Sequence, residues 1–396
     1  MPWNEVKAMD QKKDFIDSVL NDKLSFSESC RQFSISRKTG YKWVERYNVL
    51  GLEGLLENSR KPHRNSRELD ESTICQILNL RYKRPSLGPR KIKARLEDAY
   101  PNGDWPSASS IGNLLDRYGL SKKRRKRIRV PVTAPLSHCN DVNEIWSADF
   151  KGAIRLENGI AIEPLTISDA HSRFLIQCID LELKNTEHVW TMYERAFYEF
   201  GLPKKMRTDN GPPFGSCAAG RLTPLAINLV KAGIVPEWIR PGNPQENGRH
   251  ERLHRSLEEV VSLPRAATRK EIQERFRDFV DFYNNERPHE ALGQKVPSSV
   301  YSPSSRTWSG RLESPEYSSE FDVRRVSKGG QVKFKGKKVY IAENLTYEPV
   351  GVKEVSDGWW EVFYGPIYLG KIGSEDHLIK PQLPGRSKTK RAERIF

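Results

Sequence analysis

Apolar residues at helical spacing divide the first 120 residues into two successive groups of three helices. In the first group, over residues 9–51, Ser27 and Ser36 are predicted to cap the second and third helices. Trp43 turns inward from the third helix, whose outward face is basic and comprises Arg37, Lys38, Tyr41, Lys42 and Arg46. A basic helix after a short turn is typical of a helix-turn-helix that enters the DNA major groove. The alternative is a three-helix bundle with a solvated basic face.

The same pattern repeats after a polar joint at residues 58–64. The apolar stripes of the three further helices are Ile74, Ile77 and Leu78, then Ile92 and Leu96, then Ile111, Leu114, Leu115 and Tyr118. Ser107 is the predicted N-cap of the last helix. We therefore predict two DNA-binding modules in series, at residues 1–60 and 61–120, which together grip a longer site than one module can.

A run of basic residues follows the second group of helices. Lys122–Arg129 has seven basic side chains in eight positions, within a predicted linker at residues 121–137. Such a block usually forms an arm that neutralises DNA phosphates. The side chains assigned to this contact are Lys122, Lys123, Arg124, Arg125, Lys126 and Arg127. A nuclear-localisation signal is the competing interpretation.

From Trp146 onward, β-rich segments alternate with helical ones. Strands are predicted at residues 159–168, 173–181, 206–209 and 235–239, and helices after Thr186, Thr223, Gly248 and Thr268. This order predicts a mixed sheet flanked by helices, which we assign to a domain at residues 138–302. The remainder divides into a Ser/Pro-rich linker at 303–320, a small β-barrel at 321–380 and a basic tail at 381–396.

Composition and charge narrow the function. The chain of 396 residues carries a net charge of +15: +12 over residues 1–136, −2 over 137–302 and +5 over 303–396. Basic flanks around a slightly acidic middle favour a polyanionic partner for the flanks, and double-stranded DNA fits best. The sequence shows no long apolar segment or signal-peptide run, and its five cysteines form no C-x-x-C pair. A reducing, cytoplasmic location without membrane contact is the expectation.

Three acidic residues in the middle region lie at the start or end of predicted secondary-structure elements, within distinctive flanking sequences. Asp149 lies in the start of a predicted strand, Asp209 ends another before a Gly/Pro turn, and Glu251 lies in the first turns of a helix. Converging carboxylates repel one another unless a cation neutralises them, and hard oxygen ligands favour Mg²⁺ or Mn²⁺. Two such ions clamp the attacking and leaving oxygens of a phosphoryl transfer. The pattern therefore predicts an enzyme that cuts and joins DNA.

With their flanking residues, these acids resemble the DDE motif of bacterial insertion-sequence transposases in the retroviral-integrase superfamily. The phrases that carry the resemblance are Thr208-Asp-Asn-Gly211, Asn243-Pro-Gln245, Asn247-Gly248 and Tyr283-Asn-Asn-Glu-Arg-Pro-His-Glu-Ala-Leu292, with Met1-Pro-Trp3 and Ser36–Trp43 near the start. The resemblance covers residues 1–302. It implies a ribonuclease H-like α/β core, two magnesium ions held by Asp149, Asp209 and Glu251, no covalent protein–DNA intermediate, and a homo-oligomer on paired transposon ends.

Two departures from the family pattern stand out. Asp209 and Glu251 are 42 positions apart, and the additional length falls in the loop Gly215–Arg221. Glu246 is a rival for the third acid, but the phrase alignment after Asn243-Pro-Gln245 favours Glu251. No cysteine pair accompanies His254 to form a zinc site, so we assign it to a DNA phosphate contact or a scaffold contact. Lys151 and Arg255 are the other contacts assigned near the reacting phosphate.

The sequence therefore predicts a transposase that binds inverted-repeat ends, hydrolyses a phosphodiester and joins the freed 3′-hydroxyl to target DNA. A non-catalytic, sequence-specific DNA-binding regulator or domesticated transposase is the main alternative. A general nuclease, which would cut without regard to end sequence, is a third possibility.

Overall fold

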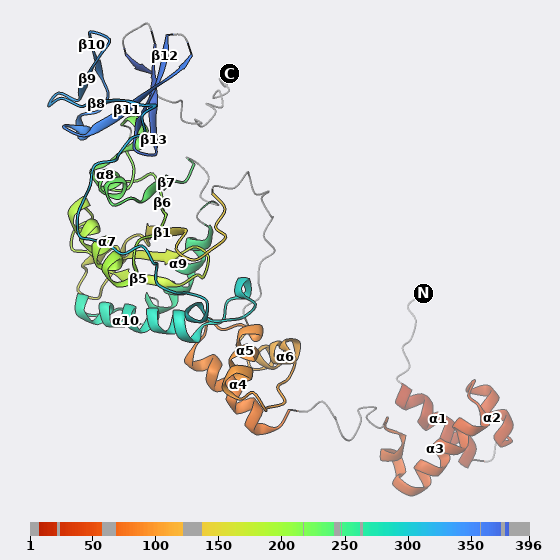
Figure 1. Ribbon diagram of the computed structural model, residues 1–396. Coiled ribbons are helices and arrows are strands. Elements are labelled where there is room, and N and C mark those ends of the chain that lie inside the picture. The colour runs from red at the N-terminus through yellow and green to blue at the C-terminus, as the bar shows by residue number, and fades with distance from the viewer. Residues whose placement is uncertain are drawn as a thin grey trace, which may run out of the picture. The chain divides into compact units, whose positions relative to one another are not determined.

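Figure 1 shows the computed structural model of the chain. It describes residues 8–21, 24–57, 69–121, 137–216, 218–240, 246, 248–261, 264–356, 358–373 and 377–379. The chain divides into two compact units, residues 1–68 and 69–396, and each is considered by itself below. Within the described residues, every helix is too short or too polar to cross a membrane.

The first unit is the predicted bundle of three helices. Its elements are α1 (Ala8–Leu20), α2 (Phe26–Gln32), α3 (Arg37–Leu50) and the 3₁₀ turn η1 (Gly51–Leu55). Ser36 caps α3 as expected, whereas α2 is capped by Ser25 and not by Ser27. Ser25 forms a reciprocal capping box with Glu28, while Ser27 already lies inside the helix. The buried side chains that join the helices are Phe15, Ile16, Cys30, Trp43 and Leu55.

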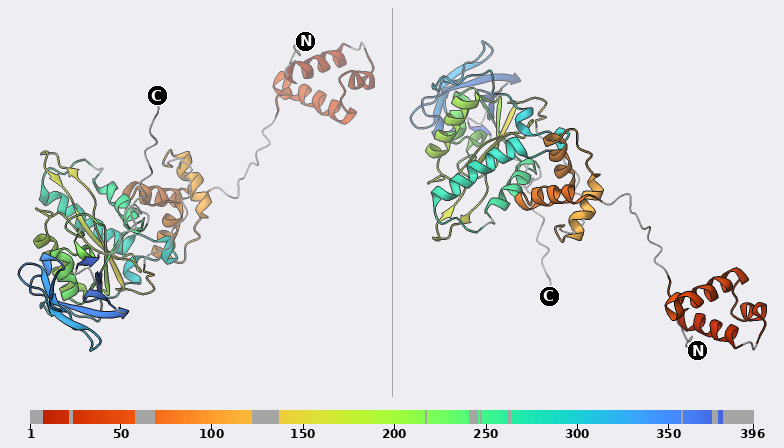
Figure 2. Two further views of the ribbon diagram at one scale, coloured as in Figure 1. Left: turned by 90° about the horizontal axis from the view of Figure 1, so that it is seen from above. Right: turned by 90° about the horizontal axis from the view of Figure 1, so that it is seen from below.

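The second group of helices belongs to the larger unit. Its elements are α4 (Glu71–Lys83), α5 (Pro89–Ala99) and α6 (Ala108–Arg117), the last capped by Ser107 as predicted. Their apolar stripes share one buried cluster with the two helices α9 (Gly248–Val261) and α10 (Arg269–Asp281). Figure 2 shows this group beside α10. The second group is therefore packed on the following domain through a common core.

A mixed five-stranded sheet forms the centre of the larger unit, in the order β5-β4-β1-β6-β7. The strands are β1 (Ile145–Phe150), β4 (Leu165–Asp169), β5 (Leu175–Ile179), β6 (Lys205–Thr208) and β7 (Val235–Trp238). β1, β6 and β7 run parallel, and β4 and β5 are antiparallel to their neighbours. The short strands β2 (Ile154–Arg155) and β3 (Ala161–Ile162) pair separately. This arrangement confirms the predicted mixed sheet.

Helices cover the sheet, as the sequence predicts. α7 (Thr186–Phe200) buries Val189, Tyr193 and Phe197 in one core with Trp146 of β1. α8 (Pro224–Lys231) is capped by Thr223 and lies between β6 and β7 in the chain. α10 continues into a π-helical turn (Phe282–Glu286) and two short 3₁₀ turns (Glu290–Leu292 and Pro297–Ser299).

The predicted linker at residues 303–320 lies along the domain surface instead of standing apart from it. Trp308 is buried against Phe197, and Arg306 donates hydrogen bonds to the carbonyls of Pro203 and Gly233. The Ser/Pro-rich composition predicts irregular backbone correctly, but it does not reveal the side chains that fasten this segment to the domain.

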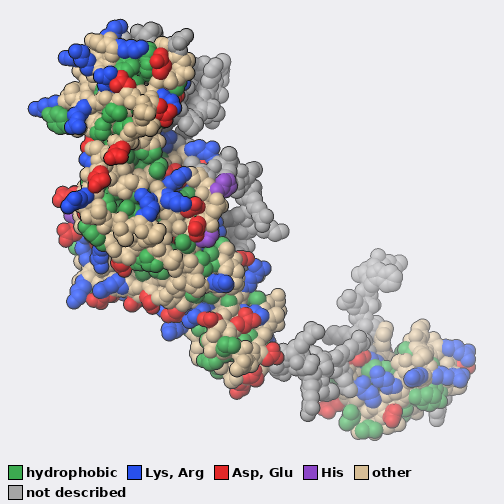
Figure 3. Space-filling model, viewed as in Figure 1, with side chains coloured by type: hydrophobic (Ala, Val, Ile, Leu, Met, Phe, Trp, Pro, Cys, Tyr) green, Lys and Arg blue, Asp and Glu red, His purple; other side chains and the backbone are tan. Residues whose placement is uncertain are grey.

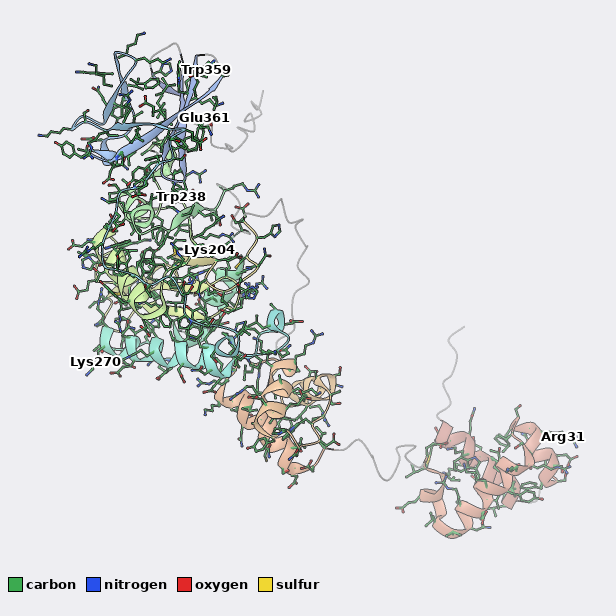
Figure 4. The ribbon with its side chains drawn as sticks, viewed as in Figure 1. Arg31, Lys204, Trp238, Lys270, Trp359 and Glu361 are labelled. Carbon is green, nitrogen blue, oxygen red and sulfur yellow. The ribbon has the colours of Figure 1, made fainter. Side chains whose placement is uncertain are left out.

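The last part of the chain forms two open sheets, so the predicted closed barrel is not confirmed. A five-stranded sheet has the order β14-β13-β12-β11-β8, and β9 and β10 form a separate pair. The strands are β8 (Asp322–Arg325), β9 (Gln331–Phe334), β10 (Lys337–Tyr340), β11 (Pro349–Ser356), β12 (Trp359–Tyr364), β13 (Ile367–Ile372) and β14 (Leu378–Ile379), with a 3₁₀ turn η7 (Glu343–Leu345). Figure 4 labels Trp359 and Glu361 on β12.

The loop Gly215–Arg221 joins these sheets to the preceding domain. It contains the 3₁₀ turn η2 (Ala219–Arg221), and Ala219 is buried in one cluster with Leu369 of β13 and Val339 of β10. Gly220 has φ +62°, and a Cβ there would lie 2.7 Å from Leu369. The additional length between Asp209 and Glu251 thus provides a docking surface for the last sheets.

Candidate active site

Asp149 and Asp209 lie on neighbouring parallel strands. β1 and β6 pair in the register Ser147↔Arg207, and the two aspartates each follow that pair by two residues. Both side chains are half-buried. Because parallel strands in register end at the same edge of a sheet, the two carboxylates occupy adjacent positions there. The structure therefore brings together two of the three predicted acids.

The Asp209 carboxylate is fixed by the turn that follows its strand. Its Oδ1 accepts the backbone N–H of Gly211 at 3.1 Å. Asn210 donates through Nδ2 to the carbonyl of Ile239, 2.7 Å away, and accepts from Arg221 Nη1 at 2.7 Å. Burial raises the pKa of Asp209, while the Gly211 hydrogen bond and the charge of Lys184 oppose that rise. A bound cation would favour the ionised form of this carboxyl group.

Tyr193 of α7 places a buried hydroxyl within electrostatic reach of both aspartates. Its side chain is fully buried, and the hydroxyl has no hydrogen-bond partner. Burial raises the pKa of Tyr193 strongly, and the negative charges of Asp209 and Asp149 raise it further. In the sequence, Tyr193 falls on the apolar stripe of its helix, with Val189 and Phe197. No local signal distinguishes such a tyrosine from an ordinary core residue.

Two histidines fasten α9 to the strand beside Asp149. Thr166 pairs with Asp149 in the β1–β4 register, and its hydroxyl lies 3.1 Å from the Asp149 carbonyl. The same Oγ1 is 2.5 Å from His250 Nε2 and 2.8 Å from His254 Nε2. A hydroxyl that donates to the carbonyl must accept from both rings, so both Nε2 atoms then carry a proton.

Burial keeps these histidines neutral. It lowers the pKa of His250 well below the usual value, and the neighbouring His254 adds to the effect. The pKa of His254 falls to about 4 through burial and the charge of Lys151. Of the two roles predicted for His254, DNA phosphate contact and scaffold contact, the hydrogen bond to Thr166 supports the scaffold role, since it packs α9 against β4. The i, i+4 spacing of the two histidines could have indicated this shared role.

Glu251 lies in the first turn of α9, next to His250, and its side chain is exposed. Across the described residues, no three His, Cys, Asp or Glu side chains are grouped to hold a metal ion. Glu251 therefore does not complete a three-carboxylate cluster with the aspartates in this structure. The rival Glu246 has a different environment, since its carboxylate is buried and paired with the guanidinium of Arg240.

The remaining contacts predicted near the reacting phosphate lie on two elements. Lys151 directly follows β1 and forms an ion pair with Glu258 of α9, with 2.7 Å between Nζ and Oε2. Its side chain is only 19% exposed, so this lysine joins α9 to the end of β1. Arg255 is exposed on α9, one turn after Glu251.

The basic face predicted on α3 is present. Arg37, Lys38, Tyr41 and Lys42 are exposed, and Arg37 and Lys38 form no ion pair with any carboxylate in the described part of the chain. Tyr41 stacks on Phe26 with ring centroids 4.2 Å apart. Arg46 is half-buried, donates to the Leu56 carbonyl at 2.8 Å and lies over the Trp43 ring. Figure 3 shows Lys and Arg side chains grouped on the visible face of this unit.

The predicted arm Lys122–Arg127 lies outside the described residues.

The donor set beside β1 and β6 fits a divalent metal. Two adjacent carboxylates offer hard oxygen ligands, and a carboxyl group whose burial raises its pKa gains from a cation. Asp149 and Asp209 would hold such an ion.

Family models match three parts of this chain. An integrase core domain matches residues 232–297, a helix-turn-helix domain matches 11–63, and a homeodomain-like domain matches 39–115. The integrase match includes α9 with Glu251 and the Tyr283–Leu292 phrase. The helix-turn-helix match includes α2, α3 and all but the first residues of α1.

Proteins of two bacterial insertion elements are similar over much of the chain. A 31.7 kDa protein of insertion element IS407 from Burkholderia multivorans is 26% identical, over 71% of this chain and 92% of its own length. A 39.2 kDa protein of IS476 from Xanthomonas euvesicatoria is 24% identical, over 60% and 66% respectively. An integrase complex of simian T-cell lymphotropic virus is 14% identical over 73% of this chain and all of that one, but the TM-score of 0.36 is too low for inference. Through the integrase core match, the helix-turn-helix match and these relatives, the chain is similar to insertion-sequence transposases of the DDE/integrase superfamily.

Proposed function

We propose that this chain binds the inverted-repeat ends of an insertion element, cleaves a phosphodiester there and joins the freed 3′ end to target DNA. The observation that carries the proposal is the pair Asp149 and Asp209 at adjacent ends of parallel strands. The family supports DNA transposition in general. The residues and the metal dependence are our assignment.

Asp149, Asp209 and Glu251 would hold two Mg²⁺ ions, or Mn²⁺ in their place. When bound, such ions neutralise the carboxylates and stabilise negative charge on the attacking and leaving oxygens. The turn around Gly211 orients Asp209 through its backbone N–H. The hydrogen bonds of His250 and His254 to Thr166 hold α9, the helix that carries Glu251, against β4.

Glu251 is a better third ligand than Glu246 for an electrostatic reason. Glu246 already has a cationic partner in Arg240, and its carboxylate is buried in that pair. Removing it from Arg240 would leave an uncompensated buried charge, which is costly. Glu251 is exposed at the start of α9, where its side chain is free to change rotamer when the charges of the aspartates are neutralised.

The first unit would supply recognition of the element's ends. Arg37, Lys38, Tyr41 and Lys42 lie on the outward face of α3, the second helix of the helix-turn-helix. Helices in this position present their first turns to base edges in the major groove. The arm Lys122–Arg127 and the exposed Arg255 would add phosphate contacts. A homo-oligomer would then bring two ends together, because joining requires both.

The acids test the catalytic part. Asp149→Asn, Asp209→Asn and Glu251→Gln should each reduce strand joining about a hundredfold or more, since changes beyond the direct ligands of a metal already cost ten to a hundredfold. Joining would be measured with labelled end duplexes and target DNA in Mg²⁺ and Mn²⁺. Binding of the same duplexes in EDTA should stay within about threefold of the wild type, because the helix-turn-helix is unchanged.

Glu246→Gln and Asp180→Asn are matched controls. Both residues are acids already paired with an arginine, Glu246 with Arg240 and Asp180 with Arg269. Any loss of joining in these variants should follow their loss of thermal stability. Wild-type joining by all three test variants would refute the assignment of the acids. A wild-type protein that binds ends but never nicks them, with any divalent metal, would be a DNA-binding regulator instead.

A further inference from the structure

Two arginines from distant parts of the chain meet at one carbonyl oxygen. Arg173 ends the turn between β4 and β5, in a left-handed conformation with φ +65°. Its Nη1 donates to the Ala170 carbonyl at 2.6 Å, and Arg249 Nη1 at the start of α9 donates to the same oxygen at 2.9 Å. Two guanidinium groups that share one acceptor bring like charges together, which costs energy unless an anion compensates.

A third arginine adds to this charge. Arg252 donates to the carbonyl of Gly248 on its own helix, and its charge reaches Arg173. Burial lowers the pKa of Arg173 to about 10, and the charges of Arg249 and Arg252 contribute to that fall. Arg173, Arg249 and Arg252 form no ion pair with any described carboxylate. The neighbouring Asp169 is buried, and its oxygens accept hydrogen bonds from Ser172 and Asn143.

The Tyr283–Leu292 phrase builds the support for these arginines. Tyr283 is buried; burial raises its pKa, and the charges of Arg173 and Arg252 oppose that rise. Asn284 fixes the beginning of β5 with two hydrogen bonds to Leu175: Oδ1 accepts from the backbone N–H at 2.8 Å, and Nδ2 donates to the carbonyl at 2.9 Å. The Arg173 backbone is thus held two residues from a double anchor. The Tyr283–Leu292 segment therefore has a structural role in positioning Arg173, separate from the metal-binding role proposed for the three acids.

We propose that Arg173, Arg249 and Arg252 form a phosphate-binding site for the DNA backbone at the start of α9, beside Glu251. Arg249 and Arg252 flank Glu251 on α9. Ala170 lies beside the start of β1 and Asp149 near its end, so a phosphate held by the arginines belongs to a part of the DNA away from the two aspartates. Guanidinium groups bind phosphate oxygens through two parallel N–H bonds. Such contacts set the register of the duplex without reading its sequence. The inference rests on the proposed function, because it takes DNA as the substrate.

The salt dependence of binding tests this site. The probe is a duplex of the element's terminal repeat, whose sequence is taken from the DNA flanking the gene, and binding is measured by fluorescence anisotropy in EDTA. Each phosphate contact contributes about 0.9 to the slope of log K against log salt. The variant R173Q/R249Q/R252Q should reduce the magnitude of this slope by about one. The variant with lysine at the same positions should keep most of the slope, because it keeps the charges.

Two further variants keep the test decisive. K270Q/R277Q removes two charges from α10, where Arg277 is 69% exposed and paired with Glu274, and should leave the slope unchanged. R252Q alone alters an exposed side chain bonded only to its own helix, so it should fold even where the triple variant does not, and should lower the slope by a smaller amount. An unchanged slope in R252Q and in a folded triple variant would overturn the proposal.

Free phosphate is the other source of this ligand chemistry. Inorganic phosphate at millimolar concentration should raise the midpoint temperature of thermal unfolding of the wild-type protein only slightly. A large rise that the triple variant lacks, together with unchanged DNA slopes, would assign the site to a small anion and overturn the DNA assignment. Because DNA binding is measured without metal, the salt slopes do not depend on whether Asp149, Asp209 and Glu251 are catalytic. The two proposals therefore fail independently.

Discussion

The two groups of three helices begin from the same sequence pattern but use their basic side chains differently. In the first, α3 exposes Arg37 and Lys38 without an ion pair to any described carboxylate. In the second, Arg90 of α5 pairs with Glu290 at 2.5 Å, and Lys93 pairs with Glu97 at 2.7 Å. A basic side chain that already has a carboxylate partner gains less from a phosphate, since it must give up the first contact.

The second group also attaches itself to the neighbouring domain. Arg84 and Arg95 both lie near Glu286, at 3.6 and 3.8 Å, and the Arg84 guanidinium covers the Phe282 ring at 4.1 Å. The exposed residues of its last helix are mostly neutral or acidic, with Arg117 in the last turn as the basic exception: Ser109, Ser110, Asn113, Asp116 and Arg117. Similar helical patterns thus produce one module with available charges and one that is anchored. The count of basic residues in the sequence does not distinguish them.

Charge reversal should separate the two groups most strongly. R37E/K38E removes two side chains placed to contact DNA, each worth about 1 to 3 kcal/mol, so end affinity should fall a hundredfold or more. R90E/K93E in α5 alters two exposed side chains that are engaged in ion pairs, and should change the affinity by less than about threefold. Anisotropy with the terminal-repeat duplex measures both. Equal losses would mean that the second group also holds DNA.

The local features of both groups could be predicted because they depend on neighbouring residues. Ser36, Ser107, Thr223 and Thr268 each cap the helix that the sequence predicted, since a cap needs only a side-chain oxygen and the next N–H groups. The mixed sheet also follows from the order of strands and helices. The position of Asp209 at a strand end was predicted correctly. Asp149 was predicted at the start of a strand but lies near the end of β1, and its adjacency to Asp209 depends on the β1–β6 register.

Features that depend on distant partners could not be predicted. The Ser/Pro-rich segment at 303–320 is fastened by Trp308 and Arg306 to residues about 100 positions earlier. The last strands leave their sheets open because β9 and β10 pair with each other and contact the larger sheet through side chains such as Val332. Arg173 was seen only as the end of a turn, and its meeting with Arg249 is a tertiary contact.

The second largest expected difference between the two units is the loss of folding stability as the pH falls. Residues 8–57 contain no histidine, whereas in the larger unit His250 and His289 are buried and His254 is half-buried. Burial lowers the pKa of His254 to about 4 and that of His289 to about 2. The unfolded chain therefore binds more protons below pH 6.5, and the stability present above that pH is lost as the pH falls.

Calorimetry at pH 7.5 and 5.5 measures this difference. At pH 5.5, one unit below the ordinary histidine pKa, each buried histidine should cost the larger unit about 1.4 kcal/mol. The transition of the first unit should move much less. H250Q/H254Q, which removes two of the groups, should reduce the acid sensitivity of the larger unit. Equal acid shifts of both transitions would show that the histidines do not control it.

Two glycine-to-alanine substitutions should give the smallest effects. They should change the free energy of unfolding in opposite directions in the first and second groups of helices. Gly40 of α3 is buried, and a Cβ there would lie 2.7 Å from Cys30 Sγ and 3.0 Å from the Phe26 ring. Although glycine lowers helix propensity, G40A should therefore destabilise the first unit by about 1 to 3 kcal/mol through overpacking. Its end affinity should weaken at temperatures where that unit begins to unfold.

Gly112 of α6 has more room, since a Cβ there would lie 3.5 Å from Pro89, an ordinary contact distance. G112A should stabilise the larger unit by about 0.5 to 1 kcal/mol, because alanine loses less backbone entropy in a helix. Urea unfolding of each variant, followed for both transitions, measures the two changes. If G40A were neutral, the close approach of α3 to α2 would not be required, and the tight packing that presents the basic face of α3 would have to be reconsidered.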